Sequence, residues 1–257
     1  MNIKKLSYNQ KRKIMLACIA IVLLLITILA CATLIYLLYG EALFSSPKVQ
    51  LKKAENYAAI VNDTPKEGIV FVGDSIIELY DLKKHYKDPL YINRGISSNK
   101  SADVLNRLQT NVIDLNPKII VLHVGTNDIG HKIPYNDYIS NMDKIIKELK
   151  GKLPNCKIIV DSIFPTVTLD NYNSRNLTKV RDNYTILNFN QGLINLCITN
   201  NVTYLDIHHH LLKGEKLNKT YTIDGLHLSE SGYNVVTREI SYCISNLLEN
   251  DKKAPNN

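Results

Sequence analysis

The apolar residues of the chain form one long uninterrupted run near its start and many short runs after it. From Ile14 to Tyr39 there is no charged residue, and only Thr27 and Thr33 are plainly polar. A run of this length exceeds the roughly 20 apolar residues that span a bilayer as a helix. The pattern therefore predicts one transmembrane helix over residues 14–39.

Beyond residue 66, short apolar runs alternate with stretches in which apolar residues recur at helical spacing. Strands and helices in alternation are typical of a right-handed, doubly wound α/β fold. We therefore predict a three-layer α/β/α sandwich with a five-stranded parallel sheet. The predicted strands are Ile69–Val72, Leu90–Ile92, Ile119–His123, Lys157–Val160 and Val202–Leu205, and the predicted helices are Ile76–Tyr86, Ser101–Leu115, Pro134–Leu149, Asp182–Thr199 and Glu230–Leu248.

The formal charge of +7 comes mostly from the segment before the apolar run. Five basic residues precede the first acidic one, Glu41; the 31 Lys and Arg less these 5 leave 26 against 24 Asp and Glu, a difference of +2. So small an excess argues against a nucleic-acid partner. Basic residues on one side of the span place residues 1–13 in the cytoplasm and the bulk of the chain outside, as a single-pass protein of the cell membrane.

These features divide the chain into five segments. A juxtamembrane helix is predicted where apolar residues recur between Lys48 and Val61, and Pro65 breaks it. The polar stretch from residue 251 is expected to fray. The predicted organisation is a cytoplasmic basic segment (1–13), the transmembrane helix (14–39), the juxtamembrane helix and linker (40–65), the α/β domain (66–250) and a disordered tail (251–257).

Cleavage of the apolar helix is an alternative to anchoring. The stretch from Ile28 to Cys31 loosely resembles a lipoprotein cleavage box. However, the apolar run continues past it to Leu38, whereas a signal peptide normally stops being apolar at its cleavage site. We therefore favour an uncleaved anchor.

The spacing of cysteine and histidine predicts neither a metal site nor a disulfide framework. Outside the span, Cys156, Cys197 and Cys243 match no metal pattern and allow at most one disulfide. The adjacent residues His208 to His210 cannot all face one ion, so we interpret them as part of a polar loop. No cofactor is predicted.

Residues that could take part in catalysis lie just after the predicted strands or just before the last predicted helix. Ser75 follows the first strand, Asn93 to Gly95 the second and Gly125 to Asp128 the third, while Asp224 and His227 precede the last helix. In a parallel sheet these positions share one edge, because all carboxyl ends point the same way. A hydroxyl, an unobstructed backbone N–H, a carboxamide and an Asp/His pair suit nucleophilic acyl transfer. The G-x-S-x-G elbow of α/β-hydrolases does not occur.

Four sequence blocks in this order make the chain similar to the GDSL, or SGNH, hydrolases in a membrane-anchored bacterial form. The resemblance covers Lys66–Leu248 and implies the family's flavodoxin-like fold. Ile76 stands where Leu is usual, an exchange of one apolar residue for another. The matching residues are Gly73, Asp74 and Ser75 in the first block, Gly95 within Asn93–Ser97 in the second, Gly125 and Asn127 in the third, and Asp224 and His227 in the last.

The resemblance implies a role for the matched residues. Ser75 would be the nucleophile, His227 its general base and Asp224 the carboxylate that orients the base. The N–H of Ser75, the N–H of Gly95 and the Asn127 side chain would form the oxyanion hole. Independent chemistry agrees, because a serine hydroxyl needs an adjacent base to attack an ester at neutral pH.

Neighbouring residues are expected to support the site. Asp74 is expected to hold the turn at the nucleophile, and Asp128 to brace the loop that carries Asn127, next to Gly125 of the third block. We interpret His123 as a packed histidine rather than a catalyst, because no carboxylate is paired with it in the sequence.

Together these observations predict a membrane-anchored extracytoplasmic serine ester hydrolase that acts on esters at the cell surface. Small acyl groups, as on O-acetylated glycans, are favoured, because the chain has no long apolar insertion to cover a lipid tail, no Trp and only 4 Phe. The alternatives are lysophospholipase, lipase-like or thioesterase activity, an O-acyltransferase working with a membrane partner, and a non-catalytic tethered binding module. The oligomeric state stays open.

Overall fold

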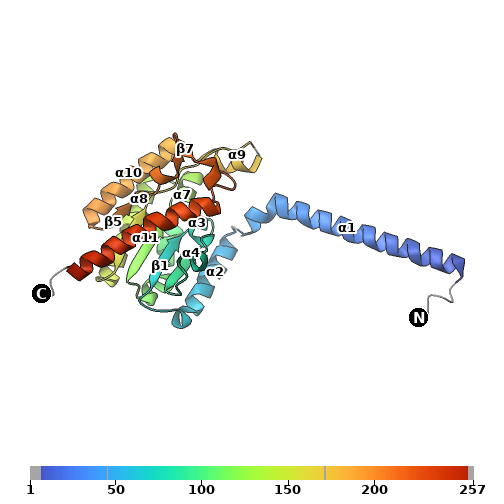
Figure 1. Ribbon diagram of the computed structural model, residues 1–257, viewed down its shortest axis with the longest axis horizontal. Helices are drawn as coiled ribbons and strands as arrows, with labels where there is room; N and C mark the ends of the chain where they lie inside the picture. Colours follow the sequence, from blue (N-terminus) through green and yellow to red (C-terminus); the bar gives the residue numbers. More distant parts are fainter. Residues whose placement is uncertain (1–6, 45, 171, 254–257) are drawn as a thin grey trace. The chain divides into compact units, whose positions relative to one another are not determined.

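The computed structural model describes residues 7–44, 46–170 and 172–253 and separates into two compact units, Met1–Val49 and Gln50–Asn257 (Figure 1). In the first unit, helix α1 spans Tyr8–Phe44. Its part from Tyr8 to Leu34, in which an 18-residue stretch has a mean hydropathy of 3.2, is long and apolar enough to be a membrane anchor or a signal sequence. The helix begins before and ends after the predicted limits of 14 and 39. Residues 1–6 of the predicted basic segment lie outside the described residues.

The second unit contains the predicted five-stranded parallel sheet, in the order β2-β1-β3-β4-β5. The predicted fold class is therefore confirmed. The order reverses between β1 and β3, and such a switch point opens a crevice at the carboxyl ends of the strands. The strands are β1 (Ile69–Gly73), β2 (Tyr91–Gly95), β3 (Ile119–His123), β4 (Lys157–Asp161) and β5 (Thr203–Leu205).

Helices cover both faces of the sheet (Figure 1). Successive side chains of β1 alternate between the faces, so that Val70 and Val72 enter one core and Phe71 the other. The first core packs against α5 (Ser101–Asn106), α8 (Tyr135–Lys152) and α10 (Asn183–Asn200), and the second against α3 (Ser75–Glu78), α4 (Leu82–Tyr86) and α11 (Glu230–Lys253).

Two predicted helices are interrupted. The stretch predicted as Ile76–Tyr86 divides into α3 and α4, because the Asp81 side chain accepts a hydrogen bond from Lys84 N at 3.1 Å and starts a new helix. The stretch predicted as Ser101–Leu115 divides into α5, α6 (Leu108–Asn111) and the 3₁₀ turn η3 (Ile113–Leu115). Apolar spacing survives such breaks, which is why the sequence pattern does not reveal them.

Several short elements were not predicted. Most of them lie in the connections after β3, β4 and β5, where no periodicity marks them. Helix α11 also extends to Lys253, into the predicted tail, while residues 254–257 lie outside the described residues. The additional elements are η2 (Val61–Asp63), α7 (Thr126–Gly130), α9 (Tyr172–Thr178), η4 (His209–Leu211), η5 (Lys219–Tyr221) and a hairpin of β6 (Leu212–Lys213) and β7 (Lys216–Leu217).

Helix α2 (Pro47–Ala59) corresponds to the predicted juxtamembrane helix. From Gln50 onward it belongs to the same compact unit as the sheet. None of its residues is buried. Its contacts with the α/β domain are therefore mostly made by polar groups rather than by a hydrophobic face.

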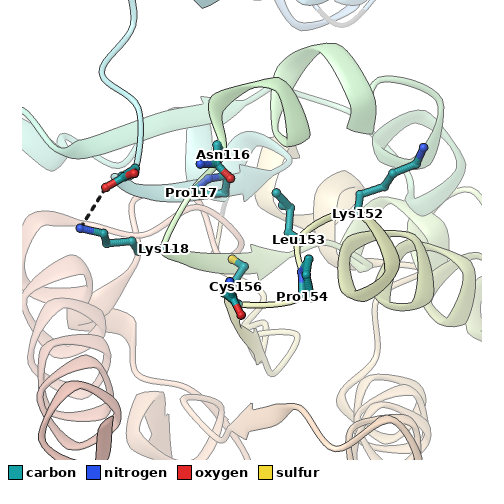
Figure 2. Close-up of a pocket in the computed structure, with 9 residues that line it drawn as sticks. Asn116, Pro117, Lys118, Lys152, Leu153, Pro154 and Cys156 are labelled. Atoms are coloured by element: carbon teal, nitrogen blue, oxygen red, sulfur yellow. Dashed lines mark ion pairs between the residues drawn. The ribbon is translucent and has the colours of Figure 1, made fainter. Parts of the chain in front are cut away.

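A small cavity of about 230 Å³ lies at the amino ends of β3 and β4 (Figure 2). Lys118 and Cys156, which directly precede these strands, line it, and Glu67 on its rim forms an ion pair of 3.2 Å with Lys118. Ligands of open α/β sheets bind at the opposite edge, outside the carboxyl ends of the strands. The functional site is therefore expected at that opposite edge.

Candidate active site

Ser75 lies immediately after β1, at the switch point of the sheet. It is the first residue of α3, and Asp74 caps this helix by accepting a hydrogen bond from Ile76 N at 2.9 Å. The Ser75 N–H is one of the first N–H groups of a helix and has no partner within it. The turn also requires glycine before it, because a Cβ on Gly73 would lie 1.9 Å from the carbonyl oxygen of His123. Ser75 is buried, with 8% of its surface exposed, and its Oγ lies 3.0 Å from His227 Nε2.

The loop before α11 carries the Asp/His pair. Asp224 Oδ2 lies 2.6 Å from His227 Nδ1, and Asp224 Oδ1 accepts hydrogen bonds from His227 N at 2.7 Å and Leu226 N at 2.9 Å. Burial raises the pKa of Asp224, but the hydrogen bonds and charge of His227 outweigh this and hold the pKa below its ordinary value. An ionised Asp224 favours the tautomer with the proton on Nδ1, which leaves Nε2 to accept the Ser75 hydroxyl proton.

Asn127 is presented by α7, after a sharp turn at Gly125, whose φ of +145° favours glycine. Its Nδ2 donates to Asn99 O at 3.1 Å, and its Oδ1 accepts from Arg181 Nη2 at 3.4 Å. The guanidinium also donates through Nε to Thr126 O at 3.0 Å. These contacts fix which way the carboxamide faces. Sequence reasoning did not identify Arg181, since it follows no strand and matches no motif.

Gly95 does not occupy the position that the resemblance implies. Its N–H donates to Asn93 Oδ1 at 2.8 Å and is therefore already engaged. A Cβ at Gly95 would lie 2.1 Å from Glu78 N and 2.6 Å from the carbonyl carbon of Ile77. The glycine thus lets β2 approach the end of α3. The prediction that the Gly95 N–H faces an oxyanion does not fit this geometry.

Ser98 lies three residues after Gly95, in the connection between β2 and α5. Unlike the N–H of Gly95, its backbone N–H is not engaged. Within the described part of the chain, no hydrogen bond is formed by the Ser98 N–H. Its φ of +63° is uncommon for a residue with a side chain. The residues on either side are held, because Ser97 N donates to Glu78 Oε2 and Asn99 N donates to Ile96 O at 3.1 Å. A serine in this conformation carries no sequence signal, which is why the sequence prediction named Gly95, three residues earlier, as the donor.

Asp128 connects α7 to the start of α5. Its carboxylate accepts hydrogen bonds from Ser101 N at 3.0 Å and from Ser101 Oγ at 2.6 Å. Burial raises the pKa of Asp128 to about 6, although the Ser101 bonds act in the opposite direction. The helix that presents Asn127 is therefore attached to the domain through a titratable group.

His123 has a carboxylate partner that the sequence did not reveal. Its Nδ1 lies 2.5 Å from Asp161 Oδ1, with both side chains 1% exposed. The two residues end the neighbouring strands β3 and β4 but lie 38 positions apart in the chain. Burial alone would lower the pKa of His123, but the Asp161 and Asp74 carboxylates outweigh it and raise the pKa. In the residues that the structure describes, His123 Nε2 and Asp74 Oδ2 have no hydrogen-bond partner.

A larger cavity, of about 580 Å³, lies at the carboxyl edge of the sheet. Two of the residues that line it also contact residues of the candidate site or its loops. Arg181 contacts Asn127, and Val167 N donates to Gly225 O at 3.0 Å. Its lining combines polar side chains with a larger share of apolar surface and includes Tyr184, which is 84% exposed. This cavity therefore adjoins groups that contact Asn127 and Gly225, at the carboxyl edge of the sheet.

The three consecutive histidines have separate partners. His208 Nδ1 lies 3.0 Å from Ile163 O, His209 Nδ1 2.5 Å from Asp206 Oδ2, and His210 Nδ1 3.6 Å from Glu239 Oε1. Over residues 7–44, 46–170 and 172–253, no group of three or more His, Cys, Asp or Glu side chains could hold a metal ion.

Comparisons with known proteins identify the family of the chain. The model of the GDSL-like lipase/acylhydrolase family matches residues 71–235, well over half of the chain. Among curated proteins, the GDSL esterase/lipase WDL1 of Oryza sativa subsp. japonica is 27% identical over 179 residues, which are 65% of this chain and 68% of that protein. The platelet-activating factor acetylhydrolase IB subunit beta homolog of Drosophila melanogaster is 34% identical over 104 residues, 38% of this chain and 44% of its own length.

Solved structures share the fold. A protein of Streptococcus pneumoniae, described as a candidate platelet activating factor, has a TM-score of 0.71 at 28% identity and covers 82% of this chain and 97% of its own. A GDSL-like lipase of Bacteroides thetaiotaomicron has a TM-score of 0.67 at 23% identity, over 76% of this chain and 98% of its own. The second similarity concerns the fold alone.

Proposed function

The chain belongs to the GDSL-like lipase/acylhydrolase family and is an ester-hydrolysing enzyme, and from this premise we propose that Ser75, His227 and Asp224 perform the hydrolysis. The observation that carries the proposal is the continuous hydrogen-bonded path from Ser75 Oγ to His227 Nε2 at 3.0 Å and from His227 Nδ1 to Asp224 Oδ2 at 2.6 Å. A nucleophile, a base and a group that orients the base occur in the order that acyl transfer needs.

The reaction would proceed through an acyl-enzyme. Ser75 Oγ attacks the ester carbonyl carbon while His227 Nε2 takes the hydroxyl proton, and Asp224 stabilises the imidazolium. The tetrahedral intermediate collapses, the C–O bond to the alcohol breaks, and His227 returns the proton to the leaving alcohol. Water, activated by the same histidine, then attacks the acyl-enzyme and releases the carboxylic acid.

Three donors are proposed for the oxyanion. The N–H of Ser75 stands at the start of α3, and the Asn127 carboxamide has one N–H bonded to Asn99 O, which leaves its second N–H for the substrate. The Ser98 N–H replaces that of Gly95 as the third donor, because Gly95 N–H is bonded to Asn93. One such donor contributes about a hundredfold or more in rate.

A small acyl group on a glycan is the substrate that we favour. The cavity offers both polar side chains, such as Asp182 and Asn183, and the exposed ring of Tyr184. This combination supports an alcohol portion that is a sugar, because sugars bind through hydrogen bonds and contacts with aromatic faces. The animal relatives that match this chain are named acetylhydrolases, which supports a short acyl group. A lysophospholipid is the second candidate, since the apolar helix α1 would keep the enzyme at a membrane.

We propose that α1 is an uncleaved anchor, with the catalytic domain outside the cell. The basic residues before the span support this orientation. Protease added to intact cells should digest the domain and leave a membrane-bound fragment. Protection of the domain would contradict the orientation, and an enzyme found free in the medium would support cleavage.

Hydrolysis of defined esters tests the function. The full chain in detergent should release carboxylic acid from aryl acetate and from acetylated oligosaccharides faster than from aryl esters of longer acids. The Ser75→Ala variant serves as the control for background hydrolysis. A preference for long acyl chains would favour the lipid substrate, and no turnover of any ester would contradict the proposal.

A further inference from the structure

We propose that helix α2 is a positioning element of the active site, in which Gln50, Lys53 and Tyr57 hold the loop of residues 95–99 in the conformation that aims the oxyanion donors. This inference rests on the proposed function, because the loop carries the Ser98 N–H and supports Asn127. The family match begins only at residue 71, so these three residues lie outside it.

Tyr57 holds the first residue of the loop. Its hydroxyl donates to Gly95 O at 3.1 Å. The Arg94 guanidinium carbon lies 4.7 Å from the centre of the Tyr57 ring, and Arg94 in turn donates to Thr64 Oγ1 at 3.0 Å. Burial raises the pKa of Tyr57, so the hydroxyl keeps its proton and acts as the donor. The backbone between Arg94 and Gly95 is thus fixed from the side of α2.

Lys53 acts on the middle of the loop through Glu78. The ammonium group forms an ion pair with Glu78 Oε1, and Glu78 Oε2 accepts the N–H of Ser97. The Lys53 and Glu78 side chains are 31% and 25% exposed, so water screens this pair only in part. Glu78 is the last residue of α3, the helix that begins at Ser75. Lys53 therefore connects α2 to both the nucleophile helix and the loop.

Gln50 holds the last residue of the loop. Its Oε1 accepts from Asn99 Nδ2 at 3.2 Å, while Asn99 Oδ1 accepts from Arg107 Nε at 2.7 Å. Asn99 is only 2% exposed, and its carbonyl oxygen is the acceptor of the Asn127 carboxamide at 3.1 Å. A single buried residue, Asn99, thus connects α2 through its side chain with a proposed oxyanion donor through its carbonyl oxygen.

The three contacts have a common consequence at Ser98. This residue lies between Ser97 and Asn99 and has a φ of +63°, a strained conformation that persists only where the surroundings impose it. Freed from α2, the loop would relax and turn the Ser98 N–H away from the oxyanion. Catalytic donors need placement within about half an ångström, so a small relaxation would lower the rate.

Mere attachment of α2 to the domain does not require these contacts. Asn111 Nδ2 already binds the helix at Ala54 O, at 3.1 Å. No residue of α2 is buried, so the helix adds little hydrophobic stabilisation. Yet its Gln50, Lys53 and Tyr57 side chains converge on one loop of five residues.

The test compares variants of the full chain in detergent micelles. Tyr57→Phe and Gln50→Ala each remove one hydrogen bond to the loop, and Tyr57→Phe keeps the ring under Arg94. Lys52→Met is the matched control, because Lys52 lies on the same helix but its ion pair with Glu55, 3.7 Å long, is exposed. For each variant, kcat and KM are measured on an aryl acetate, together with the melting temperature.

Affinity for an aryl trifluoromethyl ketone provides a second readout. A Ser75 Oγ–carbon bond forms, the carbonyl oxygen takes the electron pair as an oxyanion, and the hydroxyl proton goes to His227, so binding reports the oxyanion hole. Tyr57→Phe and Gln50→Ala should each lower kcat and the ketone affinity by the same factor, about two- to tenfold, the size of one hydrogen bond. KM should stay unchanged, and Lys52→Met should match the unsubstituted chain.

Two results would overturn the inference. If both variants keep kcat and ketone affinity, or lose only melting temperature, α2 is attached to the domain without positioning the loop, and the proposed function is untouched. If the unsubstituted chain neither hydrolyses the ester nor binds the ketone, the proposed function fails as well.

Discussion

Two of the His–Asp pairs in the domain have nearly the same geometry and different surroundings. His227 and Asp224 lie 2.6 Å apart, and His123 and Asp161 lie 2.5 Å apart. The first pair is 18% and 23% exposed and reaches Ser75 Oγ. The second is 1% exposed at both side chains. A histidine that is held by a carboxylate is therefore not catalytic for that reason alone. It also needs a nucleophile within hydrogen-bond distance of its other ring nitrogen, and a substrate must be able to reach it.

The carboxylates of the two pairs also differ electrostatically. Burial raises the pKa of both, but only for Asp224 do the bonds from His227 and from backbone N–H groups outweigh it and lower the pKa. Asp161 remains above its ordinary pKa in spite of His123. In the proposed mechanism the base is protonated in each turnover and needs a stable negative partner, a role that Asp224 would fill. The buried pair is suited to holding strands β3 and β4 together.

The largest effect should come from the His227–Asp224 pair and Ser75. Ser75→Ala and His227→Ala should each lower kcat by about a thousandfold or more, measured on an aryl acetate. The double variant should be little worse than either single one, because the two residues act as one unit. Losses that add would show that the two side chains do not share one step.

The next effect should come from the oxyanion donor. Asn127→Ala should lower kcat by roughly a hundredfold with KM nearly unchanged, because the carboxamide binds the tetrahedral intermediate more strongly than the resting ester. Steady-state kinetics on the same ester check this. A raised KM at constant kcat would show uniform substrate binding instead.

The buried pair should affect stability far more than rate. His123→Leu leaves Asp161 buried without its partner and should destabilise the domain by about 3–5 kcal/mol, whereas kcat per folded molecule should stay within about tenfold. The double variant His123→Leu/Asp161→Leu should recover much of the melting temperature. If His123→Leu abolishes turnover in folded protein, the buried pair takes part in catalysis and the contrast between the two pairs fails.

The last prediction concerns Asp128 and the stability of the domain rather than its rate. The pKa of Asp128, about 6, lies above the ordinary value of 3.8. Because the folded state holds this proton more tightly, the stabilisation is complete below the unfolded pKa and is lost as the pH rises through about 6. The loss amounts to at most about 3 kcal/mol, or several degrees of melting temperature. Melting curves between pH 4 and 7.5 should show this decline, and Asp128→Asn should flatten it. Equal slopes in both proteins would contradict the assignment.

The sequence predicted the sheet and the His227–Asp224 pair for related physical reasons. Buried parallel strands are short apolar runs, and their carboxyl ends share one edge, so each chemical group could be placed after its strand. Asp224 and His227 lie three residues apart, a spacing that one loop can close. Ser75 follows a strand whose apolar residues are unmistakable.

The remaining contacts depend on tertiary structure. His123 and Asp161 meet only because β3 and β4 are neighbours, and Arg181 reaches Asn127 from a segment without periodicity. Gly95 was expected to donate its N–H because glycine signals a free backbone. In the structure its missing Cβ instead makes room for α3, and the open N–H belongs to Ser98. A sequence indicates that a glycine is needed, but not whether conformation or space requires it.

Covalent labelling of the full chain tests the central claim most directly. A fluorophosphonate probe forms a bond to an activated serine, and peptide mass spectrometry identifies the modified residue. We expect one adduct, on Ser75, that disappears in His227→Ala and persists in folded His123→Leu/Asp161→Leu. An adduct on another residue, equal labelling of His227→Ala, or no labelling of the unsubstituted chain would contradict the assignment of Ser75 and His227 as the reacting pair.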